Sequence, residues 1–416
     1  MRIVADLHIH SKYSRACSRD LELPKIAGTC ATKGIDLVAT GDFTHPAWFA
    51  AIEKELEEDG SSGLYRLCSG GIQDIRFVLS TELALIYKDG DRTRRLHIMV
   101  QAPDLASAKT LNDQLGRRFN LKSDGRPILG LPANDLVKLC LSIHPHFLVY
   151  PAHIWTPWFS VFGSKSGYDS LADCFKDQAE HIFAYETGLS SDPEMNWRVS
   201  QLDSLTLLSN SDAHSLPNLG RECNIFDLPE VSYEALYQAI RNKTGMDFTL
   251  EFYPEEGMYH FDGHRDCAFS SHPIETAKHG GICPVCKKPL VIGVLSRVGD
   301  LAERPEGFVL PGAPGFKKLI ELDKIIAAAS GVKSRSSRKV QEMYALMIGS
   351  LGSELEILLE KPIDQIAAVA NDVIAEGVRR VRSGELIIKP GFDGQYGEVS
   401  IFNEDETPGK GQKRLF

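Results

Sequence analysis

Two histidines one residue apart, in the stretch Asp6-Leu7-His8-Ile9-His10, are the first candidates for a chemical role in the chain. They follow a short apolar run typical of a β-strand, and alternation along a strand places both imidazoles on one face. Neutral imidazole is the commonest protein ligand for zinc-like ions, so the pair would form half of a metal site. Two strand histidines hydrogen-bonded to their neighbours are the structural alternative at this point.

Acidic and histidine residues recur at the ends of later apolar runs. Strand-like runs at 35–40, 77–80, 148–152 and 205–210 each lead to such residues, and the run at 96–100 carries a histidine within it. The candidate ligands are His8, His10, Asp42, Glu82, His97, His153, Asp212 and His214. Burying so many polar groups unpaired would cost several kcal/mol each. A cluster of divalent ions with open positions for water and substrate explains a set without thiolates better.

The elements that must position these residues alternate in type. Helical patterns at 104–118 and 233–241 fall between the strand-like runs, which predicts parallel strand pairing and an α/β fold. In parallel barrels the loops at the C-terminal strand ends carry the chemistry, and the candidate ligands lie at such ends.

A second motif indicates a small zinc module. The pair His264 and Cys267 is followed along the chain by the pair Cys283 and Cys286, and each pair has the ligand-x-x-ligand spacing of a zinc ribbon. We expect a closed, structural Zn²⁺ site here. The rival fourth ligands, less well spaced, are His260, His272 and His279.

The composition bounds the class of protein. A hydrophobic content of 43% leaves enough apolar material for a large core. No run approaches the roughly 20 apolar residues that span a bilayer, and no signal-peptide pattern is present, so we expect a cytoplasmic protein without a membrane partner. The net charge of −10 argues against a protein that coats nucleic acid nonspecifically, but it is compatible with a local basic groove. Nine scattered cysteines do not suggest a disulfide framework.

The region after the glycine- and proline-rich stretch 311–315 is predicted to be helical, with helices over 319–329, 338–359 and 363–382. Basic residues cluster there, and they could track a phosphate backbone or form a solvated helix face. The two clusters are Lys333, Arg335, Arg338 and Lys339, and Arg379, Arg380 and Arg382.

The ordered motifs Asp6-Leu7-His8-Ile9-His10, Gly41-Asp42, Thr81-Glu82 and Ser211-Asp212-Ala213-His214, with His97 and His153, resemble those of the polymerase-and-histidinol-phosphatase (PHP) phosphoesterases. The resemblance implies a distorted (βα)7 barrel over residues 1–245 that binds two or three divalent metals (Zn²⁺, Mn²⁺ or Mg²⁺). It implies that the eight candidate residues are ligands, with Glu82 as a bridge, and that Asp212, His214, Glu82 and His153 carry the catalysis. Many members have a further His or Asp shortly after the His-x-His, where this chain offers only Cys17 and Asp20.

The loop that follows His153 is rich in aromatic residues. Trp155, Trp158, Phe159 and Tyr168 could form a wall that stacks a base, or they could fold back into the core. Lys12 and Arg15, just behind the His-x-His, could meet phosphate oxygens.

The order of barrel (1–245), zinc module (246–310), helical DNA-binding domain (311–400) and tail (401–416) resembles the endonuclease Q family. Four phrases carry the match: Asp6 to Ser11, Thr40 to Pro46, Glu186 to Pro193, and Pro390 to Gly394. The resemblance implies a DNA-repair endonuclease that cuts 5′ to deaminated bases (uracil, hypoxanthine, xanthine) and abasic sites. A histidinol-phosphatase-like small-molecule phosphatase would leave the zinc module and the helical domain without a purpose. A noncatalytic DNA-binding protein predicts missing ligands, and none of the main motifs is missing.

The final residues are acidic, then polar, and poor in apolar groups, which predicts a disordered tether. Its end, Gln412-Lys413-Arg414-Leu415-Phe416, resembles the pentapeptide with which bacterial repair proteins bind the sliding clamp. That resemblance implies that Leu415 and Phe416 fill an apolar pocket of the clamp while the Gln412 amide bonds at its edge.

Overall fold

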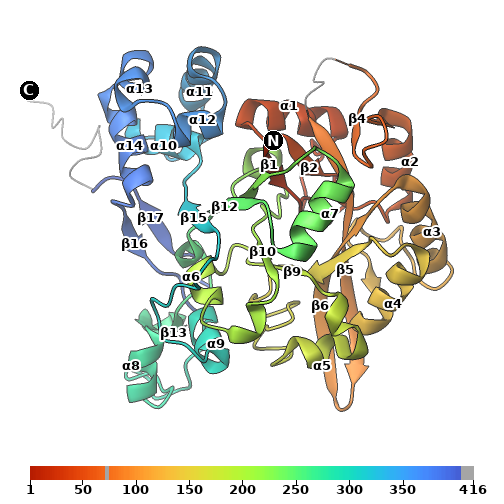
Figure 1. Cartoon of the computed structure of the whole chain (residues 1–416). Coiled ribbons are helices and arrows are strands. Elements are labelled where there is room, and N and C mark those ends of the chain that lie inside the picture. The colour runs from red at the N-terminus through yellow and green to blue at the C-terminus, as the bar shows by residue number, and fades with distance from the viewer. Residues whose placement is uncertain (71–74, 404–416) are drawn as a thin grey trace, which may run out of the picture.

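Three regions make up the computed structural model, which describes residues 1–70 and 75–403. Figure 1 shows the barrel on the right, a small module with β13 and α8 at the lower left, and a bundle of short helices with α11 and α14 at the upper left. No helix in the described part of the chain is long and apolar enough to cross a membrane.

The barrel strands confirm the predicted distorted (βα)7 fold. They are β1 (Arg2–Asp6), β2 (Leu37–Ala39), β5 (Arg76–Asp89), β6 (Arg92–Ala102), β8 (Leu148–Pro151), β9 (Ala184–Glu186) and β10 (Thr206–Leu208). β1, β2 and β5 pair in parallel, as do β9 and β10, and a parallel bridge between Ile9 and Ala213 links the strand ends. Every run predicted as a strand overlaps one of these elements.

The barrel is distorted at β6, because this strand runs antiparallel to both β5 and β8. No helix separates β5 from β6. The chain reverses at Gly90, whose φ of +57° suits a tight hairpin turn after Asp89. The prediction of uniformly parallel pairing is therefore wrong at this strand.

Helices cover the outside of the barrel. They are α1 (Leu23–Lys33), α2 (Pro46–Glu55), α3 (Leu105–Gly116), α4 (Ala133–Ile143), α5 (Leu171–Phe175), α6 (Pro193–Asn196) and α7 (Tyr233–Asn242). The helices predicted at 104–118 and 233–241 correspond to α3 and α7. Asp104 caps α3 and Ser232 caps α7, each accepting a hydrogen bond from a backbone N–H of the first turn.

The main sheet continues beyond the barrel on both sides. β11 (Cys223–Asp227) pairs with β1, β12 (Met246–Glu251) with β11, and β15 (Gly315–Lys318) with β12. At the other edge lie β4 (Tyr65–Leu67) and β3 (Leu56–Glu58), while β7 (Ile128–Leu129) pairs in parallel with β5. The small module therefore leaves the main sheet after β12 and returns to it at β15.

The small module consists of β13 (Asp262–His264), β14 (Phe269–Ser271), α8 (Pro273–Lys278) and α9 (Val294–Leu301). Val294, Leu295 and Val298 of α9 belong to the same buried core as the barrel. The module is thus fixed to the barrel by α9.

The last region contains α10 (Leu322–Ala329), α11 (Arg338–Leu351), α12 (Glu354–Leu359), α13 (Ile363–Val369), α14 (Asp372–Ser383), β16 (Ile387–Lys389) and β17 (Glu398–Ser400). Each of the two longer helices predicted from the sequence is broken in two. Gly352 leaves the helical conformation and Ser353 forms a capping box with Glu356, while Asn371 caps α14. The predicted tail also begins too early, since Ile401 is buried in this region's core.

Candidate active site

Seven of the eight predicted ligands meet at one site of the barrel: five follow the ends of β1, β8 and β10, whereas Glu82 lies within β5 and His97 within the antiparallel β6. Their nitrogen and oxygen atoms form three overlapping groups, each with atoms within 4.8 Å of one another. The groups are His8, His10 and Glu82; His10, Asp212 and His214; and Glu82, His97 and His153.

Glu82 lies between two of these groups. Its Oε1 is 2.7 Å from His97 Nδ1 and 3.0 Å from His153 Nε2. Its Oε2 is 3.3 Å from His10 Nε2 and 3.8 Å from His8 Nε2. One carboxylate oxygen therefore faces each pair of imidazoles, which is the geometry of the predicted bridge.

Several ligand atoms are buried without a hydrogen bond. His8 Nε2, His10 Nε2 and Asp212 Oδ1 have no hydrogen-bond partner among the described residues. Buried polar atoms are normally paired, and orphaned imidazole and carboxylate atoms pointing at one another are what a bound cation would satisfy. The residues present thus fit divalent metal ions, with nitrogen and oxygen donors suited to Zn²⁺ or Mn²⁺.

Acidic side chains behind the cluster orient two imidazoles. His8 Nδ1 lies 3.0 Å from Glu186, which also accepts from the Asn210 amide at 2.8 Å, so the His8 Nε2 lone pair faces the cluster. Asp42 Oδ1 lies 3.0 Å from His10 Nδ1, and Ser11 N donates to Asp42 Oδ2 at 2.7 Å. Asp42 belongs to none of the three groups; its carboxylate contacts His10, and its role as a ligand stays a prediction.

The histidines keep the buried carboxylates ionised. Burial by itself would raise the pKa of Asp212, but His10, His8 and His214 hold it well below its usual value. Burial lowers the pKa of His97 to about 4, which leaves a neutral imidazole suited to a metal.

Backbone strain is concentrated at this site. Asp42, His153 and Asp212 adopt left-handed backbone with φ of +48°, +26° and +44°. Each lies two to four residues after the end of a barrel strand. At Gly188 a Cβ would lie 2.3 Å from His153 Cβ, so only glycine allows the two loops to approach. Strained residues at strand ends are typical of functional sites.

The zinc module brings its four predicted ligands together. Ligand atoms of His264, Cys267, Cys283 and Cys286 lie within 4.8 Å of one another, and Cys286 Sγ is 3.9 Å from His264 Nε2. A Cys₃His set of this kind fits one tetrahedral Zn²⁺. The rival ligand His272 instead caps α8 through Nδ1.

Comparison with known proteins places these sites in a family. The chain is similar in structure to the lesion-specific endonuclease PfuEndoQ from Pyrococcus furiosus, with a TM-score of 0.85 and 30% identity over 97% of this chain and 96% of that chain. Endonuclease Q in complex with a 27-mer duplex bearing an abasic lesion matches with a TM-score of 0.84 and 30% identity, over 99% of both chains. The chain belongs to the endonuclease Q family.

Two curated relatives and one family model agree with this endonuclease Q assignment. The uncharacterized protein YqxK of Bacillus subtilis is 30% identical over 413 residues, 96% of this chain and 99% of that protein. The uncharacterized protein MJ0043 of Methanocaldococcus jannaschii is 32% identical over 259 residues, and the chain covers only 31% of its length. The family model of the MJ0043 C-terminal domain matches residues 321–385.

Arg126 is a residue of this endonuclease Q site that the sequence did not reveal. Its Nη1 donates to Glu82 Oε2 at 2.8 Å, and its side chain remains partly exposed. Neighbouring Gly125 packs so tightly that a Cβ there would lie 2.4 Å from Asp42 Oδ2. The residue lies in a loop outside every strand-end motif, so no spacing signal points to it.

The aromatic loop divides between core and surface. Trp155 is 1% exposed and donates to Asn196 Oδ1, and Tyr168 is 4% exposed beside Tyr87. Neither offers a face to a base, which corrects their prediction as pocket walls. Trp158 is 49% exposed, and the ring of Phe159, at the same rim, lies 4.7 Å from that of His97.

The basic residues proposed for phosphate binding are mostly paired. Lys12 Nζ donates to Glu22 at 2.9 Å, whereas Arg15 is highly exposed and lies 3.8 Å from Asp124. Arg379 is held by Glu376 and Glu385, and Arg382 donates to backbone carbonyls at the end of α12. The α14 cluster is therefore structural, not a free phosphate surface.

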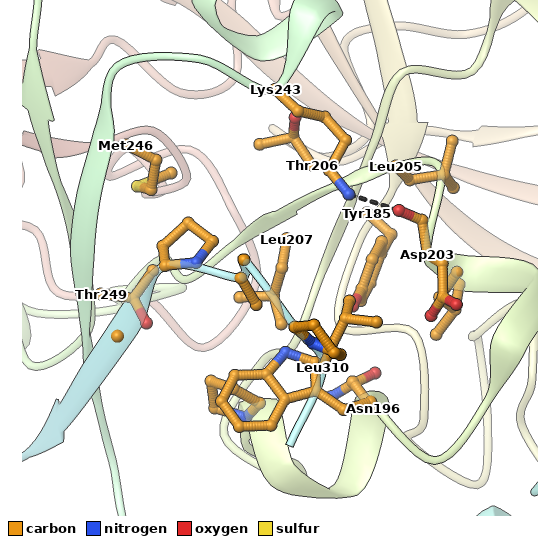
Figure 2. Close-up of a pocket in the computed structure, with 18 residues that line it drawn as sticks. Tyr185, Asn196, Asp203, Leu205, Thr206, Leu207, Lys243, Met246, Thr249 and Leu310 are labelled. Atoms are coloured by element: carbon orange, nitrogen blue, oxygen red, sulfur yellow. Dashed lines mark hydrogen bonds between the residues drawn. The ribbon is translucent and has the colours of Figure 1, made fainter. Parts of the chain in front are cut away.

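A cavity of about 290 Å³ lies on the outside of the barrel, between β9–β10 and the segment 310–315. Figure 2 shows Tyr185 and Leu207 lining it, with Lys243 reaching across to Asp203. The next residue after Tyr185 along β9, Glu186, faces the cluster, so Tyr185 points away from it. This cavity is not the reaction site.

Proposed function

We propose that the protein is a metal-dependent DNA-repair endonuclease that hydrolyses the phosphodiester 5′ to deaminated bases and abasic sites. The observation that carries this proposal is the cluster around Glu82, where orphaned ligand atoms converge in a chain of the endonuclease Q family. The relative bound to a duplex with an abasic lesion supports the abasic part of the substrate range.

Divalent ions held by the seven clustered ligands would supply Lewis acidity and acidify a water molecule for attack on phosphorus. The chain's own residues position that chemistry. His214 Nδ1 donates to the Asp212 carbonyl at 2.8 Å, which turns Nε2 toward the cluster. Arg126, beside Glu82, is placed to meet an anionic phosphate oxygen. Direct hydrolysis should leave 3′-hydroxyl and 5′-phosphate ends.

One assay tests the function. Purified protein with Zn²⁺, Mn²⁺ or Mg²⁺ is incubated with labelled duplexes containing a single uracil, hypoxanthine or abasic site, beside an undamaged duplex and p-nitrophenyl phosphate. We expect a single cut 5′ to each lesion. Turnover of p-nitrophenyl phosphate alone would favour the small-molecule phosphatase, and binding without a cut would favour the noncatalytic DNA-binding protein.

Trp158 remains our candidate for a base-stacking side chain, with Phe159 beside it at the rim. Trp158→Ala should lower the rate on uracil in duplex DNA by more than about threefold while leaving thermal stability unchanged. The matched variant Trp155→Ala should instead lower stability by about 3–5 kcal/mol, because it empties a core position. An unchanged rate with Trp158→Ala would remove this loop from base recognition.

Gln412, Leu415 and Phe416 lie outside the described residues, and their binding to the sliding clamp remains a proposal from the sequence. A peptide of the last ten residues should bind the bacterial clamp, and deleting 412–416 should abolish clamp binding without altering cleavage of free DNA. Loss of cleavage in the absence of clamp would assign the tail to the folded enzyme instead.

A further inference from the structure

The β5–β6 hairpin continues well past the metal cluster. In its register Ala84 opposes His97, Ile86 opposes Arg95 and Lys88 opposes Thr93. Strand side chains alternate, so these residues share one face of the ribbon with Glu82. Because Glu82 and His97 belong to the cluster, we call this side the inner face; it carries Glu82, Ala84, Ile86, Lys88, Thr93, Arg95 and His97.

The inner face is long enough to contact a ligand at some distance from the metal cluster. Lys88 lies six residues beyond Glu82 along β5, and at about 3.3 Å per residue this is about 20 Å. Figure 1 shows β5 and β6 running on together below the body of the barrel. The same ribbon thus joins the reacting centre to an outlying surface.

Two cations on the inner face have no acidic partner among the described residues. Lys88 is exposed, and the Arg95 guanidinium lies 5.6 Å from the centre of the Trp158 ring. Ile128, which pairs in register with Ala84, is 61% exposed at the opposite edge of the face. Unpaired cations between exposed apolar side chains suit a polyanion that also presents sugars and bases.

We propose that the inner face is an arm that holds duplex DNA beside the cut, with Lys88 and Arg95 on successive phosphates. This inference rests on the proposed function, and it extends the substrate contact to about six base pairs on one side of the lesion, at about 3.4 Å per pair. The chain as a whole is acidic, with a net charge of −10, so attraction of DNA must come from local surfaces such as this one.

The hairpin supplies a matched control for the test. Arg92 opposes Asp89, so it lies on the outer face of the same hairpin, and like Lys88 it is exposed. Binding of an abasic duplex is measured by fluorescence anisotropy at several salt concentrations for wild type, Lys88→Ala/Arg95→Ala and Arg92→Ala. We expect the double variant to lose about tenfold in affinity and its salt slope to fall by about two, because two phosphate contacts are lost. Arg92→Ala should behave as wild type.

Trimming the duplex locates the contact. When the DNA on one side of the lesion is shortened to about three base pairs, less than the reach of the arm, wild type and the double variant should bind equally. The proposed arm would be contradicted if the double variant kept the affinity and salt slope of wild type. It would also be contradicted if Arg92→Ala lost as much affinity as the double variant, or if the loss did not depend on duplex length. If wild type itself neither binds nor cuts damaged duplex, the proposed function fails; if wild type cuts and the double variant binds normally, only the arm fails.

Discussion

Two buried acidic clusters in this molecule behave in opposite ways. At the metal cluster Glu82 is buried and Asp212 is half-buried, both among histidines, and the Arg126 guanidinium lies 2.8 Å from Glu82. The second pair is Glu222, just before β11, and Glu251, at the end of β12, where the barrel sheet meets the helical region. Both of these side chains are fully buried, and each has a carboxylate oxygen without a hydrogen-bond partner among the described residues.

The difference lies in the cations within reach. Burial and then repulsion from Glu251 raise the pKa of Glu222, and burial raises the pKa of Glu251 to about 8. At the metal cluster burial acts in the same direction, but His97 and Arg126 overcome it and lower the pKa of Glu82. Arg221 and Lys318 do not offset burial at the second pair, so these acids stay protonated, whereas burial among imidazoles and a guanidinium makes Glu82 an ionised ligand. Four substitutions test this comparison.

The largest effect is expected for Asp212→Asn. This change removes a ligand atom and the charge that balances three histidines, so cleavage should fall by about a thousandfold or more. Bound metal, measured by elemental mass spectrometry, should fall as well, while binding of damaged DNA persists. Near-normal turnover would remove the barrel cluster as the active site.

Arg126→Ala comes next. Loss of one charged donor beside a reacting phosphate typically costs about 10²-fold in kcat, and Arg126→Lys should restore part of that loss because it keeps the charge. Metal affinity, measured by titration calorimetry, should be unchanged or tighter, since a cation next to Glu82 is removed. A lower metal affinity with normal kcat would assign Arg126 to the cluster's assembly only.

Asp42→Asn should have a smaller effect, because Asp42 acts through His10. Weakening the partner of a metal-binding imidazole typically costs about 10–100-fold in metal affinity or activity. Excess metal in the assay should recover most of the rate. If metal does not rescue the variant, Asp42 is a direct ligand as the sequence predicted, and our reading of its position is wrong.

Glu251→Gln should leave cleavage unchanged and alter only stability. The pKa of Glu251 is raised to about 8 from its ordinary 4.5, so folding retains a proton that the unfolded chain releases. The stability of the wild type should then decline as pH rises from about 4.5 to about 8, and the variant should lack this part of the decline. Urea melts at pH 5 and pH 8 measure it; equal declines in both proteins would show that Glu251 is ionised.

Much of the site followed from local spacing. Alternation on a strand put His8 and His10 on one face, and the strand-end positions of Glu82, His153 and Asp212 predicted a common location. The four ligands of the zinc module followed from two short spacings of the same kind. The fold class also followed from the alternation of strand and helix patterns. These features depend only on neighbours along the chain and on the period of each element.

Other features depended on residues distant in sequence. Arg126 reaches Glu82 because its loop closes over the cluster, and Trp155 is buried because Asn196 and the barrel core surround it. The antiparallel β6 creates the hairpin whose inner face carries Arg95. Whether a buried acid is an ionised ligand like Glu82 or a neutral group like Glu251 is likewise set by which cations the fold brings near. Local spacing was enough to predict which residues could bind metal. Their charge states depend on the fold, because charge in a low-dielectric interior is set by neighbours in space.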